Sequence, residues 1–346
     1  MTHAMASASP IAPATVTPRS ASHTITSPGT VAARGFPYDR SAVTQKTPTC
    51  GATTLRIRTL GQFAASLHAP DGPQNPSWAS EQARLLLKCL LAAPTYRLSR
   101  DQLIDLLWPH QDASQGRESL RHALSRLRRT LEPGPRTYGT SSFLASNREE
   151  VWLIVESGED VASSVWVDRV HFERAARSAM EALGRQDADP DGIGEQRGEY
   201  ALSLYAGPFL PADLYADWAH TMRTRCQRLW MALVRALADH AVVQYQFERA
   251  LFLLNELVAA SPADEDAAAR LMRIQAATGH RAEAIQTYDT VCAQLDTQIG
   301  VPPTRELKEL CQAIRSCESQ QELLRLVPAE PCSRQPWSHH PAASLA

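Results

Sequence analysis

The chain has 346 residues, 44% of them hydrophobic, and a formal net charge of −2 at pH 7. Such a length and apolar content allow about two domains, each with a buried core. No apolar run reaches the roughly 20 residues of a transmembrane helix, and the N-terminus lacks the apolar stretch of a secretory signal peptide. We therefore expect a soluble, cytoplasmic protein.

The two ends of the chain differ in composition from its middle. Residues 1–53 consist largely of Ala, Ser, Thr and Pro, with Asp39 as their only acidic residue. The C-terminal tail, which we place at 318–346, is rich in Pro and Ser from about residue 328. Because such segments bury too little apolar surface to offset chain entropy, we expect both to be disordered. The residues between them are predicted to form two domains, 54–156 and 157–317.

Charge and cysteine content narrow the partners of these domains. Residues 55–155 contain 13 basic and 9 acidic residues, whereas residues 156–327 contain 17 basic and 26 acidic residues. Only the first block suits a polyanion such as nucleic acid. The seven cysteines include no Cys-x-x-Cys pair, which is typical of a reduced protein without a zinc site. Cys89 and Cys292 fall among apolar positions and are predicted to be small core residues.

The first clear element is a short helix that begins after Ser99. Ser99 is a predicted N-cap and Gln102, three residues later, is its capping-box partner. Pro109 ends this helix, and a polar connector, His110–Gly116, leads into a second helix that Asp112 or Ser114 is available to cap. Two helices joined in this way are predicted to form a helix-turn-helix.

The second helix, which runs to Leu131, has two unlike faces. Leu120, Leu124, Leu127 and Leu131 form one apolar stripe at helical spacing. The residues centred opposite the stripe are polar, namely His122, Ser125, Arg126 and Arg129. Ser119 and Arg121 flank this polar group. These side chains can hydrogen-bond to base edges or phosphates, and the alternative is an ordinary solvated face.

Two β-prone runs follow, Ser142–Ala145 and Val151–Val155, with Arg148 near the turn between them. A helix-turn-helix followed by such a hairpin is a winged helix. In that fold the second helix enters the major groove, and the wing reaches a neighbouring phosphate or the minor groove. The alternative for Arg148 is a solvated turn residue.

From Trp166 onward the pattern is helical almost throughout. The predicted helices are 170–183, 199–205, 218–245, 247–260, 264–278, 282–296 and 304–316. Matching residues recur 34 positions apart, as in Ala250 and Ala284 or Leu257 and Val291, which is the tetratricopeptide period. A non-repetitive helical bundle is the alternative. The fold class is therefore mainly α, with an N-terminal winged helix followed by a tetratricopeptide-like array.

Motifs that carry catalytic chemistry are missing from the sequence. It contains no P-loop, no Gly-x-Ser-x-Gly and no His-Glu-x-x-His. The acidic residues are spread over helix surfaces, where solvation is their default role. We expect a binding protein that is not an enzyme and uses no cofactor or metal.

Eight stretches also match a known family in order and spacing. They are Leu55–Phe63, Trp78–Leu86, Leu106–Pro109, Ser119–Arg129, Val165–Asp168, Leu204–Leu210, Asp217–Trp218 and Ile299–Pro303. Together they resemble the bacterial transcriptional activator domain proteins of the SARP (antibiotic regulatory protein) type. The large members of that family carry an ATPase module after the activator domain, so this chain resembles a small or truncated member. Its long N-terminal extension departs from the family pattern.

The resemblance implies a transcription factor whose copies bind side by side on direct repeats and contact RNA polymerase or its sigma factor. Base-contact candidates are Arg121, His122, Ser125 and Arg126. Phosphate candidates are Ser114, Arg117, Ser119, Arg128 and Arg129, and Arg148 is the wing candidate. Polymerase-contact candidates are His110, Gln111, Asp112 and Gln115. The rival function is an interaction scaffold, in which the array binds a peptide or regulator and the winged helix contacts only protein.

Overall fold

The structure is a computed structural model, and it describes residues 53–69, 72–78, 80–132, 141–155, 164–184, 192–317 and 319–326. The predicted N-terminal extension up to residue 52 and the tail after residue 326 lie outside the described residues. The predicted start of the tail at residue 318 is too early. Gln320–Leu324 forms helix α11, and Leu323 is buried in the core of the last helices.

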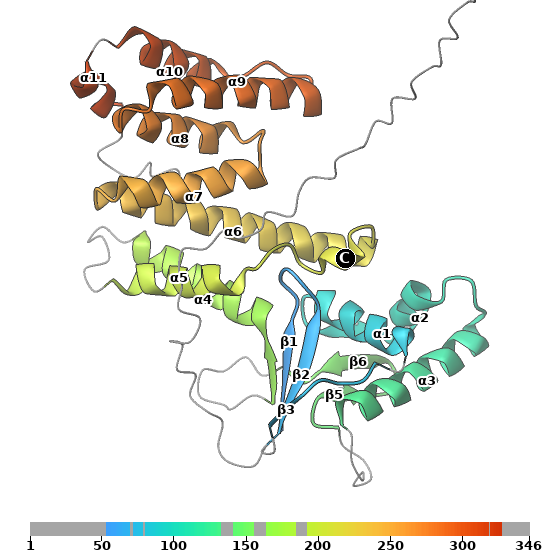
Figure 1. Ribbon diagram of the computed structural model, residues 1–346. Coiled ribbons are helices and arrows are strands. Elements are labelled where there is room, and N and C mark those ends of the chain that lie inside the picture. The colour runs from blue at the N-terminus through green and yellow to red at the C-terminus, as the bar shows by residue number, and fades with distance from the viewer. Residues whose placement is uncertain are drawn as a thin grey trace, which may run out of the picture. The chain divides into compact units, whose positions relative to one another are not determined.

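A four-stranded sheet opens the described chain (Figure 1). Its strands, in the order β3-β2-β1-β7, are β3 (Gly72–Gln74), β2 (Ala64–Ala69), β1 (Thr54–Arg58) and β7 (Val165–Val167). β7 pairs with β1 in parallel, so that Leu55 lies beside Val165 and Ile57 beside Val167. All four side chains are buried in one core. The predicted boundary at residue 156 therefore separates this sheet from one of its own strands.

Three helices and a second sheet complete the winged helix. The helices are α1 (Glu81–Ala92), α2 (Arg100–Leu107) and α3 (Ala113–Leu131). The second sheet has the order β4-β6-β5, with β4 (Arg97–Ser99), β6 (Glu150–Leu153) and β5 (Leu144–Ser146). The predicted hairpin is β5–β6, and β4 is a third strand that the sequence did not indicate. Three residues are too few to show a periodic signal.

The remaining helices form the array. They are α4 (Asp168–Leu183), α5 (Ile193–Leu204), α6 (Asp217–Val243), α7 (Phe247–Ala260), α8 (Glu265–Ala277), α9 (Arg281–Gln298), α10 (Arg305–Ser316) and α11 (Gln320–Leu324). Successive helices from α6 to α10 pack on one another, and Figure 1 shows them stacked in chain order. The seven predicted helices are confirmed, except that α5 begins six residues earlier than expected, and α11 is an additional helix that was not predicted.

Small residues set the spacing of the stacked helices. Ala250 in α7 and Ala284 in α9, the pair that marks the 34-residue period, are both fully buried, as are Leu257 and Val291. The methyl side chains of Ala250 and Ala284 let neighbouring helices approach closely. The array is therefore the tetratricopeptide-like fold that the period predicts.

A buried carboxylate joins the winged helix to the array. Asp168, the first residue of α4, accepts hydrogen bonds from the Thr59 backbone N–H (2.7 Å), the Thr59 hydroxyl (2.7 Å) and the Leu60 N–H (2.9 Å). Burial raises the pKa of Asp168, while these hydrogen bonds oppose the rise. The β1–β2 turn that supplies the donors is thereby tied to the start of the array.

Further contacts surround this junction. Lys88 of α1 pairs with Asp213 in the 3-10 helix Pro211–Asp213, at 2.8 Å. Gly61 has a positive φ, and a Cβ there would lie 2.7 Å from the Ala206 backbone, so no larger residue fits. On the outer face of β7, Trp166 stacks on His171, with centroids 5.1 Å apart. Burial, with help from Arg174 and Arg56, lowers the pKa of His171 to about 4.

The cysteine predictions are half confirmed. Cys89 is buried in the winged-helix core, and burial raises the pKa of its thiol to about 12. Cys292 is only half-buried. Both thiols are free.

Candidate nucleic-acid interface

Two N-terminal caps place the basic helix α3. The Ser99 hydroxyl accepts from the Gln102 backbone N–H, and the Gln102 side chain accepts from the Ser99 N–H, so the predicted capping box starts α2. Asp112 is the N-cap of α3, and its carboxylate accepts from the N–H groups of Ser114 (2.8 Å) and Gln115 (2.9 Å). Of the two predicted caps of α3, the structure uses Asp112.

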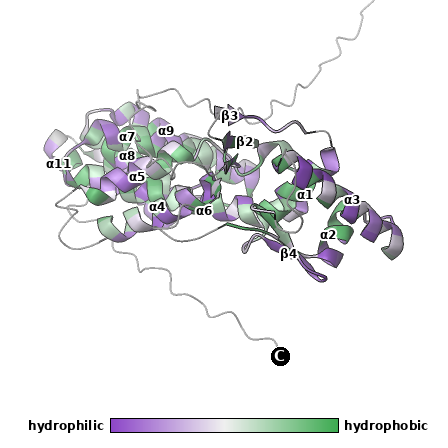
Figure 2. Ribbon diagram, turned by 90° about the horizontal axis from the view of Figure 1, so that it is seen from below, coloured by the Kyte–Doolittle hydropathy of each residue, from purple (hydrophilic) through white to green (hydrophobic). Residues whose placement is uncertain are grey.

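The apolar stripe fixes which face of α3 is exposed. Leu120, Leu124, Leu127 and Leu131 are each at most 3% exposed. Gly116 lets α2 pack closely, because a Cβ at this position would lie 2.4 Å from the Ile104 side chain. Most side chains on the opposite face are exposed within the described part of the chain, and Figure 2 shows much of α3 in purple (hydrophilic). The predicted orientation of the helix is confirmed.

The four base-contact candidates lie on this open side. Arg121, His122 and Arg126 are exposed, and Ser125 is half-buried. Arg121 and His122 both contact the carboxylate of Glu118, at 3.2 and 3.6 Å. Arg126 contacts only the Ser80 hydroxyl, at 3.5 Å, among the residues that the structure describes.

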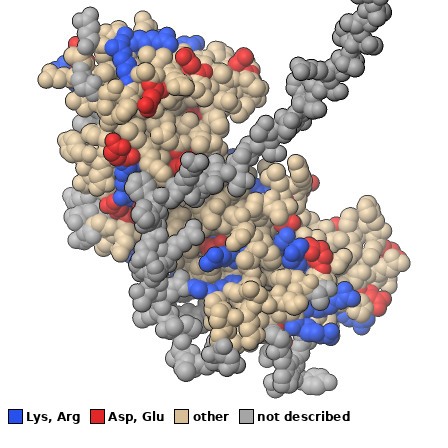
Figure 3. All heavy atoms as spheres, in the orientation of Figure 1, with Lys and Arg blue, Asp and Glu red and all other residues tan. Residues whose placement is uncertain are grey.

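Glu118 is the site residue that sequence reasoning missed. Its side chain is 64% exposed on the same open side as its two partners. The signal was available in the sequence, because Glu118 precedes Arg121 by three positions and His122 by four, the spacings at which helix neighbours touch. Figure 3 shows acidic side chains (red) beside the basic ones (blue) in the region of α3.

The phosphate candidates divide into free and engaged groups. Arg117 and Arg129 are exposed and pair with no carboxylate in the described part of the chain. Arg128 donates to the Ser146 hydroxyl of β5 at 2.7 Å and so ties α3 to the wing. Ser119 donates to the Gln111 side chain at 2.8 Å. Ser114 is exposed in the first turn.

The wing presents Arg148 at an ordered turn. The Asn147 side chain accepts from the N–H groups of Glu149 and Glu150, and the Arg100 guanidinium donates to the Asn147 carbonyl at 2.9 Å. Arg148 is exposed, and within the described residues it has no carboxylate partner. The turn therefore holds its backbone while leaving its side chain open.

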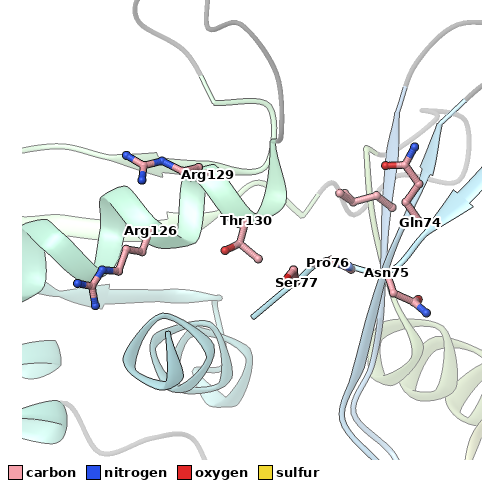
Figure 4. Close-up of a pocket in the computed structure, with 8 residues that line it drawn as sticks. Gln74, Asn75, Pro76, Ser77, Arg126, Arg129 and Thr130 are labelled. Carbon is pink, nitrogen blue, oxygen red and sulfur yellow. The ribbon is translucent and has the colours of Figure 1, made fainter. Parts of the chain in front are cut away.

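A hollow of about 590 Å³ opens beside the C-terminal half of α3. Its lining residues are Leu67, Gln74, Asn75, Pro76, Ser77, Arg126, Arg129 and Thr130. Figure 4 shows Thr130 turned toward Ser77, while Arg126 and Arg129 extend from α3 on the side away from Gln74 and Asn75. Both guanidinium groups therefore point away from the hydroxyl and amide groups on the opposite wall of the hollow.

The polymerase-contact candidates lie on the connector between α2 and α3 and in the first turn of α3. The predicted connector, His110–Gly116, is too long, because α3 begins at Ala113 and already contains Gln115. His110, Gln111, Asp112 and Gln115 are all exposed. Asp112 caps α3 and Gln111 holds Ser119, so two of the four already have structural roles. His110 and Gln115 make no side-chain hydrogen bond among the described residues.

Two family patterns match the chain in tandem. The family described as "Transcriptional regulatory protein, C terminal" matches residues 75–140, which include α1 to α3. The family described as "Bacterial transcriptional activator domain" matches residues 167–315, from β7 to α10. The chain thus contains a bacterial transcriptional activator domain, which is consistent with a protein of the SARP type. Both matched families are transcriptional regulators and not enzymes.

Two regulatory proteins and one solved structure are similar to this chain. The regulatory protein AfsR of Streptomyces coelicolor is 29% identical over 68% of the chain, and AfsR of Streptomyces griseus is 29% identical over 78%. The chain spans only 22% and 26% of those two proteins. The structure of EmbR of Mycobacterium tuberculosis, solved in complex with a low-affinity phosphopeptide, matches this chain with a TM-score of 0.60 and 18% sequence identity. The match covers 80% of this chain and 69% of the EmbR chain. EmbR therefore supports the fold.

No helix in the described ranges is long and apolar enough to cross a membrane. Within the same ranges, no cluster of three or more His, Cys, Asp or Glu residues is arranged to hold a metal ion.

Proposed function

We propose that this transcriptional regulator binds duplex DNA at specific promoter sites, in the cytoplasm and on the nucleoid. In the proposed complex α3 lies in the major groove and Arg148 of the wing reaches the neighbouring backbone. Residues 53–168 form the DNA-binding part in this proposal, and the array from α4 to α10 forms the effector part.

One observation carries the proposal. Arg117, Arg126, Arg129 and Arg148 lie on the exposed face of α3 and on the wing, and none pairs with a carboxylate within the described residues. Cationic groups left without a carboxylate are available to phosphates, which supply most of the affinity of DNA-binding proteins. A purely protein-binding winged helix has no need of this arrangement.

The hollow beside α3 extends the same interpretation. Both guanidinium groups extend from α3 on the side away from Gln74 and Asn75, so a phosphate beside the helix would meet them there. We assign Arg129 to the phosphate backbone and place the Arg126 guanidinium at the edge of the groove, within reach of a base edge and of the backbone. Arg128 is a positioning residue for the wing.

The array is proposed to contact RNA polymerase or its sigma factor and to align a second copy on direct repeats. Its acidic excess makes it unsuited to DNA and suited to a protein partner. The connector with His110, together with Gln115 in the first turn of α3, is the second region from which a polymerase contact is available.

The test uses the full chain. Genomic fragments retained by the purified protein are sequenced, and the affinity of the best fragment is measured at several salt concentrations. We expect an enriched sequence with repeated half-sites and an affinity that falls steeply with salt, because phosphate contacts release counterions. Affinity independent of salt, or fragments with no common sequence, would contradict the proposal and favour the interaction scaffold.

A further inference from the structure

Glu118 is a carboxylate on the side of α3 that faces away from the protein core. It is the sixth residue of a 19-residue helix, so it lies beyond the first turn, and Asp112 already caps the helix. Its side chain is 64% exposed, and its only described partners are Arg121 and His122 on the same helix. Pairs this exposed contribute little to stability. Neither capping nor packing accounts for an acid at this position.

The two carboxylate oxygens of Glu118 have different surroundings. Oε1 receives both partners, the Arg121 Nη2 atom at 3.2 Å and the His122 Nε2 atom at 3.6 Å. Oε2 has no partner among the residues that the structure describes. Arg121 therefore offsets the charge of the carboxylate and, with His122 beside it, limits its movement, while one acceptor oxygen is left for a group that approaches α3.

The major groove offers few groups that suit such an acceptor. Phosphates repel it, and the O6 and N7 atoms of guanine and the O4 atom of thymine are themselves acceptors. Adenine presents its N6 amino group beside the acceptor N7, whereas the only polar group that cytosine presents is its N4 amino donor. A group that only accepts hydrogen bonds therefore fits cytosine best.

We propose that Glu118 reads a cytosine in the major groove, with Oε2 accepting from the N4 amino group. Arg121 and His122 are positioning residues that orient the carboxylate through Oε1. This inference rests on the proposed function, because it requires α3 to lie in the major groove. It adds a specificity determinant to the basic residues that supply affinity.

The test is selection of bound sequences from a randomised duplex library by the full chain and its variants. The wild type is expected to prefer cytosine at one position by about tenfold, within the range of a single good base contact. Glu118→Ala is expected to accept all four bases there. Glu118→Gln is expected to shift the preference to adenine, because an amide both donates and accepts and so matches N7 and N6.

Two further variants separate reading from charge. Asp105→Asn removes an exposed carboxylate from α2 and is expected to keep the cytosine preference, even if overall affinity rises. Arg121→Gln is expected to weaken the preference at the same position that Glu118 reads. If Arg121 had a base contact of its own, its loss would instead change another position.

The failures of the two proposals are distinguishable. A wild type that selects a sequence, together with Glu118→Ala and Glu118→Gln variants that select the same one, would overturn the role of Glu118 alone. A wild type that selects no sequence would overturn the proposed function and this inference with it.

Discussion

Several arginines of the helical array and several of the winged helix have opposite surroundings. In the array, Arg235, Arg249 and Arg270 each pair with carboxylates from another helix. On α3 and the wing, Arg117, Arg129 and Arg148 have no such partner within the described residues. The same side chain therefore holds helices together in one region and stays available to an external anion in the other.

This difference shows that net charge alone is a poor guide to a binding surface. The array contains 17 basic residues between 156 and 327, more than the winged helix, yet several of them pair with carboxylates of the array itself. What distinguishes the candidate DNA-binding surface is that several of its cations have no carboxylate partner within the described residues. The predictions below test that distinction.

The largest effect is expected when Arg126 and Arg129 are both changed to Gln. Two contacts of about 1–3 kcal/mol each predict a loss of DNA-binding free energy of about 2–6 kcal/mol. The salt dependence should become shallower by about two phosphate contacts, because two cations no longer release counterions. Binding isotherms at two salt concentrations measure both. Thermal stability should be unchanged, since Arg129 and Arg126 are exposed.

Arg228→Gln with Arg305→Gln is the matched control. Both residues are exposed on array helices, and the change in charge is identical. An equal loss of DNA affinity in this control would mean that overall charge, and not the surface of α3, sets binding.

The next effect is expected at the junction. Asp168→Ala leaves the Thr59 and Leu60 donors buried without an acceptor, which should cost about 3 kcal/mol or more of the free energy of unfolding. Urea denaturation measures the loss. Asp217→Ala, at an exposed site in the first turn of α6, is the control and should change stability by less than about 1 kcal/mol. Equal effects of the two variants would show that the junction carries no special stability.

A smaller effect is expected in the array. Arg249→Gln removes the ion pairs with Glu195 and Glu199 of α5, with an expected loss of about 1 kcal/mol of stability and no change in DNA affinity. Arg325→Gln, an exposed site at the end of α11, should change neither. A fall in DNA affinity with Arg249→Gln would break the division between the two regions.

The smallest effect concerns pH. His171 is lowered to a pKa of about 4 in the folded chain, mainly by burial, whereas an unfolded histidine titrates near 6.5. Between these values the unfolded chain binds the additional proton, so stability should fall as the pH falls from about 6.5 to 4. Partial exposure reduces the size of this effect. Melting temperatures of the wild type and His171→Gln across this range should diverge, while His220→Gln, on the exposed side of α6, should follow the wild type.

Much of the fold followed from local sequence patterns. Three features could be predicted because their residues are close in sequence or recur at a fixed spacing. They are the capping box at Ser99, the leucine stripe of α3 and the 34-residue period. The strands β3, β4 and β7 have three residues each, and their pairing depends on residues far away in the chain. No local pattern reveals such partners.

The candidate site divides in the same way. Helical periodicity by itself placed Arg121, His122, Ser125 and Arg126 on one open side of α3, because that side is opposite the buried leucines. Tertiary structure decided which cations remain available, since Arg128 is held by Ser146 while Arg126 opens onto a hollow lined by residues from another segment. Tertiary structure also decided that β7 and Asp168 belong to both regions. β7 pairs with β1, and Asp168 accepts hydrogen bonds from the turn after β1, and both contacts join residues more than 100 positions apart. Sequence periodicity determines which face a side chain occupies, and only the packed chain determines what that face meets.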